Sequence, residues 1–296
     1  MKVLMITGDK NFKPGHERYD LQRSAVEDLT VLYWGRGSIL PKIPAGDFDV
    51  VTAQDPFWRG LFALHAASRS GAKCNIQVHT DLSVYKGLKH ILAQITLRHA
   101  DSIRVVSKKI KGQVERVGVT AKITVLPVFV DVSRFHSVVR SVHEGKNILW
   151  VGRFEEEKDP LLAVEVLKEV LKTEPSATLV MLGAGSLGQQ ISERAANLPV
   201  ETPGWQDPVV FLDTADVALC TSKHESFGAS IVEALAAGVP VVSPDVGVAK
   251  EAGANVVSYK DLAAEVVKVL ESGHKGHLQL TLLTKEAWAQ KWKDSL

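Results

Sequence analysis

Short apolar runs alternate along this chain with longer stretches in which apolar residues recur every three or four positions. Short runs of this kind are typical of buried parallel strands, and the longer pattern is typical of amphipathic helices. Strands that alternate with helices predict an α/β protein with parallel sheets. In the first half we expect strands at 3–6, 31–34, 49–54, 75–81, 102–107 and 122–126, and helices near 17–28, 57–70, 85–99 and 108–117.

A polar segment, 131–146, has no clear periodic element, and the alternation restarts after it. A length of 296 residues suggests two domains, which we place at 1–136 and 145–272. The final segment, 280–296, has Leu283, Trp288 and Trp292 at near-helical spacing, so its helix either crosses back to the first domain or docks on its own. In the second half we expect strands at 147–151, 177–182, 217–220 and 255–257, a short strand reaching 204, and helices at 160–172, 186–197, 209–214 and 262–270.

Composition narrows the function classes. A net charge of +1 gives no electrostatic reason to expect a nucleic-acid partner. The two cysteines, Cys74 and Cys220, lie far apart in apolar strands and match no metal spacing, which fits buried thiols in a reducing compartment. No apolar run approaches the ~20 residues of a membrane helix, and the N-terminal run is too short for a signal peptide. We therefore expect a soluble, cytoplasmic protein.

The stretch from Cys220 to Val242 contains the main candidate chemistry, and its pattern predicts a strand, a sharp loop, a helix and a further strand. Ser226 is expected to cap the helix, whose first N–H groups would form an anion site suited to phosphate. Glu225 lies before this site and Glu233 lies after it. A ligand with hydroxyls at both ends and a diphosphate between them would match, and a nucleotide-sugar is such a ligand. The alternative is two solvated glutamates, although Glu233 lies in an otherwise apolar helix.

Two further segments follow predicted strands. Arg153 and Lys158 flank a loop and could grip a diphosphate, although both could instead pair with the acidic run Glu155–Glu157. Gly183-Ala184-Gly185-Ser186-Leu187-Gly188 is literally G-x-G-x-x-G, and Glu201 follows where a ribose-binding acid would be expected. This pattern is the best case for a dehydrogenase. A lone glycine fingerprint in mid-chain is weak, and nothing near it supplies an acid for hydride transfer.

These segments together resemble the retaining GT-B glycosyltransferases of family 4. The resemblance implies the GT-B fold, in which two Rossmann-like domains have parallel sheets facing a central cleft. The first domain would be a shortened acceptor-side domain, and the second would bind the nucleotide-sugar. It also implies a hexosyltransferase-type, retaining transfer from a nucleotide-diphosphate sugar to a glycan, lipid or small-molecule acceptor. The residues that carry it are 150–154, 158–159, 183–185, 221–222 and 225–242, and residues 106–107 and 126–135 resemble the end of the family's first domain. The resemblance is strong over 147–245 and loose before 100.

The resemblance also implies roles for single residues. Glu233 would hold the ribose hydroxyls, and Arg153 with Lys158 would bind the diphosphate. Glu225 would face the donor sugar, and His79 would lie near the reaction centre. No cofactor and no metal are expected. The rest of the donor-binding set would be Gly15, Gly183, Gly185, Gly204, Ser226, Phe227, Gly228 and Ala229.

Other functions stay open at this point. An epimerase of the same architecture would need further acids or bases, and the shortened first domain suggests a non-catalytic nucleotide-sugar-binding protein. A capped core histidine is an equal interpretation of His79. Peripheral contact with a membrane is also left open.

Overall fold

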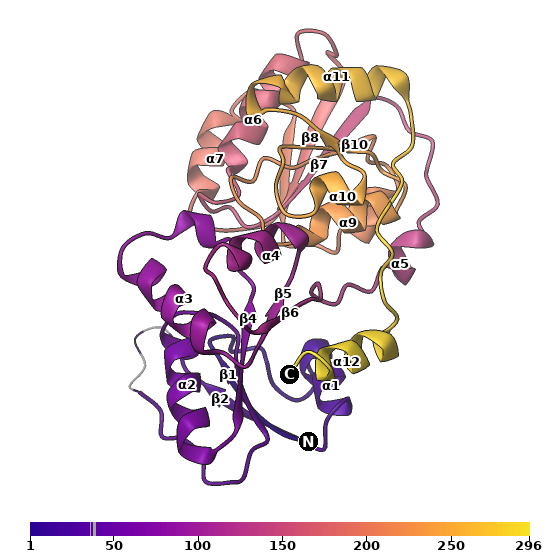
Figure 1. The fold of residues 1–296 in the computed structure, drawn as a ribbon. Helices are drawn as coiled ribbons and strands as arrows, with labels where there is room; N and C mark the ends of the chain where they lie inside the picture. The colour runs from indigo at the N-terminus through magenta and orange to yellow at the C-terminus, as the bar shows by residue number, and fades with distance from the viewer. Residues whose placement is uncertain (36, 38–39) are drawn as a thin grey trace. The chain divides into compact units, whose positions relative to one another are not determined.

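The computed structural model describes residues 1–35, 37 and 40–296. The chain forms two compact units: unit 1 comprises Met1–Phe129 with Leu283–Leu296, and unit 2 comprises Val130–Leu282 (Figure 1). Within the described residues each unit has one six-stranded sheet, and all of its strand pairs are parallel. The expected α/β class is therefore confirmed.

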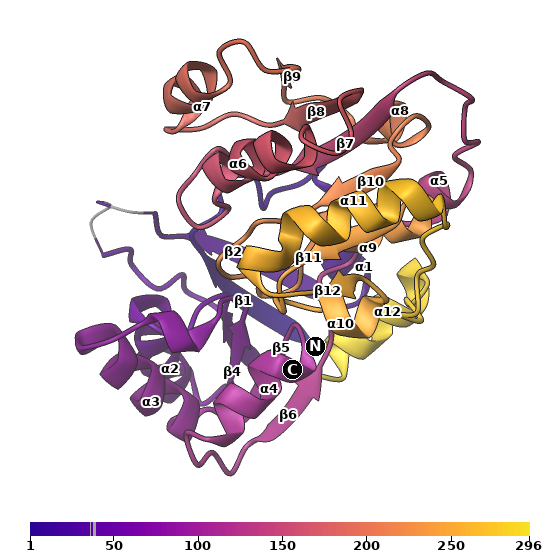
Figure 2. The same cartoon turned by 90° about the horizontal axis from the view of Figure 1, so that it is seen from above.

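In unit 1 the strand order is β2-β1-β3-β4-β5-β6, so the first strand of the chain lies next to the edge strand β2. Helices α2 and α3 lie side by side (Figures 1 and 2). The elements are β1 (Lys2–Thr7), α1 (Glu17–Ser24), β2 (Asp28–Tyr33), β3 (Val50–Ala53), α2 (Trp58–Ser70), β4 (Lys73–Val78), a 3-10 turn (Leu82–Val84), α3 (Leu88–His99), β5 (Ser102–Val105), α4 (Lys108–Glu115), β6 (Lys122–Val125) and α12 (Lys285–Lys293).

Successive side chains of a strand point to opposite faces of the sheet, so the helices on one face of unit 1 pack against every second residue of a strand. Val3 and Met5 share one face of β1, and they pack in a core with Trp288 and Trp292 of α12. Helix α12 lies beside α1 in Figures 1 and 2. The C-terminal segment is therefore a structural part of unit 1, although about 150 residues of unit 2 separate the two in sequence.

In unit 2 the strand order is β12-β11-β10-β7-β8-β9, which places β10, β7 and β8 next to one another. The elements are α5 (Ser133–His136), β7 (Lys146–Val151), α6 (Pro160–Val170), β8 (Ala177–Leu182), α7 (Gly188–Arg194), β9 (Val200–Gly204), α8 (Val209–Leu212), β10 (Val217–Leu219), α9 (Ala229–Ala236), β11 (Val241–Ser243), α10 (Ala249–Ala252), β12 (Asn255–Val256), a 3-10 turn (Tyr259–Asp261) and α11 (Leu262–Ser272).

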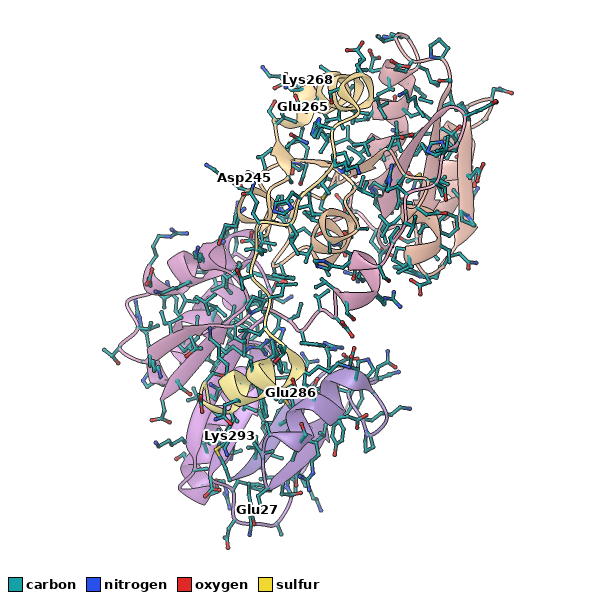
Figure 3. The ribbon with its side chains drawn as sticks, turned by 90° about the vertical axis from the view of Figure 1, so that its right-hand side faces the viewer. Glu27, Asp245, Glu265, Lys268, Glu286 and Lys293 are labelled. Carbon is teal, nitrogen blue, oxygen red and sulfur yellow. The ribbon has the colours of Figure 1, made fainter. Side chains whose placement is uncertain are left out.

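Alternation along β7 also separates the two faces of this sheet. Ile148 and Trp150 belong to a core that includes buried residues of α6 and α11. Helix α11 is amphipathic: Val266 is fully buried, whereas Lys268 is 73% exposed and pairs with Glu265 at 3.3 Å (Figure 3). Burial of one apolar stripe per helix thus holds the helices against the sheet.

Two expected elements were wrong in detail. The helix expected at 17–28 ends at Ser24, and β2 begins at Asp28 instead of position 31. Residues 28–30 begin the β1–β2 ladder, which continues to Tyr33, and Lys2 is the partner of Asp28. Pairing with a strand from elsewhere in the chain outweighed the local helical pattern. The polar segment 131–146 contains the helix α5, which at four residues is too short to show a periodicity.

Candidate functional site

The loops that follow β7, β8 and β10 leave the same edge of the unit 2 sheet, because these three strands are parallel and lie next to one another. These loops are 152–159, 183–187 and 220–228, and they contain most of the expected donor-binding residues. In open α/β sheets ligands bind beyond the carboxyl ends of the strands. The fold therefore gathers at one edge residues that the sequence spreads over more than 70 positions.

An ion pair joins two of these loops. The Lys158 ammonium donates a short hydrogen bond to Glu225 Oε1, and both side chains are mostly buried, at 20% and 11% exposed. Ser222 Oγ donates to the same carboxylate oxygen at 2.8 Å. The Glu225 carboxylate is thus held by a charge-assisted contact and a hydroxyl, so its position is well defined.

A buried hydroxyl holds the backbone beneath this pair. Thr221 Oγ1 accepts from Trp150 Nε1 at 2.9 Å and donates to the backbone carbonyls of Lys158 and Asp159, at 2.9 and 2.8 Å. Asp159 has a left-handed φ of +46°, immediately before Pro160 begins α6. One side chain thus links β7, the end of its loop and the loop after β10.

The two cations of the 152–159 loop have different partners. Arg153 donates to Glu157 at 2.6 Å and is 61% exposed, so the acidic run pairs with this cation. Lys158 instead reaches across to Glu225. The third acid, Glu155, accepts from the backbone N–H and the hydroxyl of Ser186, at 3.0 and 2.7 Å, and these hydrogen bonds lower its pKa. Because the Arg153–Glu157 pair is exposed, it contributes little to stability, and Arg153 can exchange this partner for a ligand.

The glycines of G-x-G-x-x-G bring the loops after β7 and β8 into contact. A Cβ on Gly183 would lie 1.9 Å from the Gly152 carbonyl oxygen, and one on Gly185 would lie 2.6 Å from that of Phe154. The Gly183 N–H donates to the Gly204 carbonyl at 3.0 Å, which continues the contact to the end of β9. Loop packing therefore explains these glycines without a dinucleotide, and the dehydrogenase interpretation loses its main support.

Helix α9 begins differently from the expectation. Its N-cap residue is Gly228, in the left-handed region at φ +93°, and no side chain caps the helix, so the expected Ser226 cap was wrong. The buried Phe227 explains the turn, because its carbonyl accepts from Val248 N–H at 2.9 Å. A residue with φ > 0 at this turn is most easily glycine. Ser226 remains half-buried beside the loop, and Ala229 is the first helical residue.

Glu233 lies on α9, half-buried, and lines a small pocket whose other walls are largely apolar. Burial raises the pKa of its carboxyl group, whereas the Arg134 charge acts in the opposite direction. Arg134 is itself engaged in a two-pronged pair with Asp207, at 3.0 and 2.6 Å. Among the described residues, the Glu233 carboxylate has no hydrogen-bond or ion-pair partner. Such a group is costly unless a ligand supplies its hydrogen bonds.

Unit 1 contains a cavity of about 800 Å³ that includes residues following β1, β3 and β4. His79 lines it, and burial, then the charges of Arg104 and Arg18, lowers the pKa of its imidazole. Gly15 does not line the cavity: it lies in an exposed turn at φ +84° and donates its N–H to Asp20. The cavity residues are Thr7, Gly8, Asp9, Arg18, Trp34, Gly35, Gly37, Gln54, Asp55, Phe57, Trp58, Arg59, His79, Thr80, Tyr85 and Lys89.

Two ion pairs in this cavity were not predicted from the sequence. Arg18 pairs with Asp9 at 2.5 Å, and Arg59 makes a short contact with Asp55. The sequence contained a signal for both pairs, because each acid follows an apolar strand at the carboxyl edge of the sheet.

The chain also contains an Asp-x-Asp sequence, Asp47–Asp49. It precedes β3, so it lies at the opposite edge of the sheet from the cavity, and the Asp49 carboxylate accepts a hydrogen bond from the Lys2 N–H at 2.7 Å.

In the described part of the chain, His, Cys, Asp and Glu side chains form no group of three or more that could hold a metal ion. Every helix in the described ranges is too short or too polar to cross a membrane.

Comparison with known proteins identifies the family. Residues 4–134 match the model of glycosyltransferase family 4, and residues 145–272 match that of glycosyl transferases group 1. The chain belongs to the GT-B glycosyltransferases of family 4 and group 1. Two solved structures share this fold: the lipopolysaccharide outer core galactosyltransferase WaaB in its apo form (TM-score 0.71, 18% identity, 100% of this chain and 95% of that chain) and HepE of Anabaena in complex with UDP (TM-score 0.72, 15% identity, 99% and 94%).

The curated relatives are matched over only part of their length. The chain is 28% identical over 159 residues to the GDP-mannose-dependent alpha-(1-6)-phosphatidylinositol dimannoside mannosyltransferase of Mycobacterium tuberculosis, covering 50% of this chain and 42% of that protein. It is 28% identical over 251 residues to the phosphatidyl-myo-inositol mannosyltransferase of the same organism, covering 79% and 60%. The matched part thus spans 42–60% of the length of these relatives.

The glycine contacts give a stability prediction for unit 2. Gly183→Ala should destabilise the unit by about 3 kcal/mol or more, because the new methyl group meets a backbone carbonyl that cannot move away easily. Gly188→Ala is the matched control: its Cβ would lie 3.8 Å from Phe154, and alanine favours the helix that begins there. Denaturant unfolding followed by circular dichroism measures both. Equal stability of the two variants would contradict the proposed contact.

Proposed function

We propose that this chain is a retaining glycosyltransferase that transfers a sugar from a nucleotide-diphosphate donor to an acceptor hydroxyl. The observation that carries the proposal is the half-buried, partnerless carboxylate of Glu233 at the same edge of the sheet as the Lys158–Glu225 pair. Family membership supports it, as do relatives named as mannosyltransferases and as a glycogen synthase. These names favour transfer over epimerisation or binding without chemistry.

The donor-binding roles follow from position. Glu233 accepts hydrogen bonds from the ribose hydroxyls, which replaces the partners that its carboxylate lacks. Lys158 and Arg153 bind the diphosphate together with the first N–H groups of α9 at Ala229. Phe227, Gly228 and Ser226 surround the donor sugar through the backbone and the hydroxyl. Gly204 meets the base at the end of β9, and Gly183 with Gly185 keeps the loops close enough to form the site.

The proposed reaction replaces one bond at the anomeric carbon. The bond from this carbon to the phosphate oxygen breaks, and the acceptor oxygen bonds on the same face of the sugar. The leaving phosphate oxygen takes the acceptor proton, so no separate base is needed. Lys158 stabilises the charge that develops on the leaving diphosphate, and Glu225 stabilises the positive charge on the sugar carbon.

Unit 1 would bind the acceptor. Its cavity, of about 800 Å³, is large enough for a sugar-sized group, and aromatic side chains with ion pairs line it. We propose that His79, which lines this cavity, contacts the acceptor there. The relatives' names point to glycan or lipid acceptors, because several contain phosphatidylinositol or diphosphopolyprenol. We also propose a cytoplasmic location, because Cys74 and Cys220 are unpaired and buried, and burial raises the pKa of the Cys74 thiol to about 12.

Peripheral contact with an anionic membrane is the second proposal for unit 1. Trp58 of α2 and Leu88 and Ile91 of α3 are 51%, 59% and 50% exposed, which is unusual for large apolar side chains on neighbouring helices. Lys86 and Lys89 lie in the same segment, and residues 82–100 contain no acidic residue. Apolar residues beside an unopposed positive charge favour an anionic lipid surface.

Vesicle binding tests this surface. The protein should sediment with vesicles of phosphatidylcholine and phosphatidylglycerol but not with phosphatidylcholine alone, and added salt should weaken the binding. Ile91→Ser should reduce binding several-fold. Val210→Ser, which changes a side chain that is 65% exposed in unit 2, should leave it unchanged. Equal losses in both variants would contradict a role for α3.

We propose that Lys158 and Arg153 neutralise the negative charge of the diphosphate, so transfer should not need a metal ion. Activity in EDTA should therefore stay within about twofold of that in buffer, as expected for charge stabilisation by side chains. The assay measures sugar transfer with and without added magnesium or manganese. Complete loss in EDTA, with recovery on adding metal, would show that the cations do not suffice.

The two glutamates give the sharpest kinetic prediction. Glu233→Ala should raise KM for the donor roughly 10- to 150-fold and spare kcat, because hydrogen bonds to a charged group contribute about 1.5–3 kcal/mol in ground and transition states alike. Glu225→Gln keeps the shape and removes the charge, so it should lower kcat with nearly unchanged affinity for the nucleoside diphosphate. Glu169→Ala, on α6 at an exposed pair with Lys172, is the control. Stable variants with wild-type kinetics at both positions would refute the assignment.

A further inference from the structure

A buried polar network runs inward from the cavity of unit 1. His79 Nε2 lies 3.4 Å from Gln77 Oε1. The same oxygen accepts from Arg104 Nη1 at 2.7 Å. Gln77 is fully buried and Arg104 is 1% exposed, so water does not compete for these contacts. The two residues face each other across the paired strands β4 and β5, where Gln77 is the register partner of Arg104.

The network determines which end of the Gln77 amide faces His79. A guanidinium only donates hydrogen bonds, so the amide oxygen must point toward Arg104. The Gln77 nitrogen donates on its other side to Thr52 Oγ1 at 2.9 Å, and Thr52 donates in turn to Asn75 Oδ1 at 2.8 Å. Asn75 Nδ2 donates to the carbonyl of Ser295 at 2.8 Å. Reversal of the Gln77 amide would break its contacts on both sides.

Arg104 is itself held independently of His79. Its Nε and Nη2 donate to the carbonyls of Leu126 and Pro127, at 3.1 and 2.9 Å. Its guanidinium lies 5.0 Å over the ring of Trp288, whose Nε1 donates to Pro127 as well. Among the described residues no carboxylate pairs with Arg104. A buried cation without a carboxylate is costly, so its position demands an explanation other than stability.

We propose that Arg104 and Gln77 are positioning residues that hold His79 as a neutral imidazole with its proton on Nε2, leaving the Nδ1 lone pair to accept a hydrogen bond from a ligand hydroxyl. The reason is geometric: an amide oxygen faces Nε2, and only a protonated nitrogen can donate to it. The inference rests on the proposed function for its purpose, because the hydroxyl would be that of the donor sugar or the acceptor. The tautomer itself follows from the network alone.

The charges around His79 favour the same neutral state. Two ion pairs, Asp9–Arg18 and Asp55–Arg59, line the cavity with it and cancel internally. Tyr85 and Lys89 also line the cavity, and Lys89 carries a further positive charge. With the buried Arg104 behind it, the imidazole thus lies in surroundings of net positive charge, which disfavour imidazolium. Burial contributes in the same direction and is the largest cause of the lowered pKa of His79.

Long-range ¹H–¹⁵N NMR of the full chain labelled at histidine tests the tautomer directly. His79→Gln assigns the signal. The wild-type protein should show the Nε2–H form near neutral pH, and the His79 signal should stay neutral at about pH 6, where exposed histidines take up protons. This measurement needs neither substrate nor activity.

Two variants test the cause. Gln77→Glu keeps the shape and puts a carboxylate beside His79, so the titration midpoint of His79 should rise by about one pH unit or more. Gln77→Leu removes the acceptor, so both neutral tautomers should appear, and kcat should fall while affinity for a nucleoside diphosphate is retained. Gln22→Leu is the control for loss of a buried glutamine, because Gln22 is 3% exposed and lies on α1. It should leave the His79 signal unchanged.

The outcomes separate the inference from the proposed function. An Nδ1–H or protonated His79 in the wild-type protein, or Gln77 variants with the wild-type His79 signal, would overturn the inference and leave transferase activity untouched. The expected Nε2–H signal, together with wild-type kcat in His79→Gln, would remove His79 from the reaction. The positions of Gln77 and Arg104 would then control a histidine that the transfer does not use, which overturns their proposed role as positioning residues.

Discussion

The hydroxyl of Thr221 is the contact on which the unit 2 site depends. It accepts from Trp150 on β7 and donates to the carbonyls at the end of the β7 loop, so it ties together two segments that are separated by more than 60 residues. The Lys223 N–H adds a second link between the loops after β7 and β10, because it donates to the Glu157 carbonyl at 2.9 Å. Lys158 and Glu225 then form their ion pair above Thr221. A diphosphate could contact this lysine without reorganising the backbone, which is the advantage of a preorganised site.

In unit 1, too, buried polar side chains hold separate segments together, and here they form a larger network. Thr52, Asn75, Gln77 and Arg104 lie on central strands, where apolar side chains would be the usual choice. Their amide orientations determine one another, and the network ends at the backbone of the C-terminal segment, through Asn75 and Ser295. A network of this kind is tolerated only when its members are satisfied. Helix α12 is therefore part of the arrangement that places His79, because Trp288 of that helix covers Arg104.

The two units differ in which of their charged side chains lack a partner of opposite charge. In unit 1 the acids of the cavity are paired with arginines, and the remaining positive charge comes from Lys89 and the buried Arg104. In unit 2 the half-buried Glu233 carboxylate lies among largely apolar side chains without a hydrogen-bond or ion-pair partner among the described residues, and burial raises its pKa. An unpaired carboxylate favours a ligand that donates hydrogen bonds, such as a diol. An excess of positive charge favours an electron-rich or anionic group. These preferences agree with the proposal that unit 2 binds the nucleoside and unit 1 the acceptor.

The sequence by itself determined the class of fold, the strands and most helices, and the family, because these depend on local periodicity and on motifs whose spacing is preserved along the chain. It also placed Arg153 and Glu225 in loops that follow strands, where a parallel sheet gathers its loops, with Lys158 just before one helix and Glu233 on another. Only the tertiary structure decided which partner each charge took. Arg153 pairs with Glu157 four residues on, whereas Lys158 pairs with Glu225, 67 positions away. The Arg104–Gln77–His79 contacts likewise depend on strand register and on a C-terminal helix, and neither leaves a signal in the local pattern.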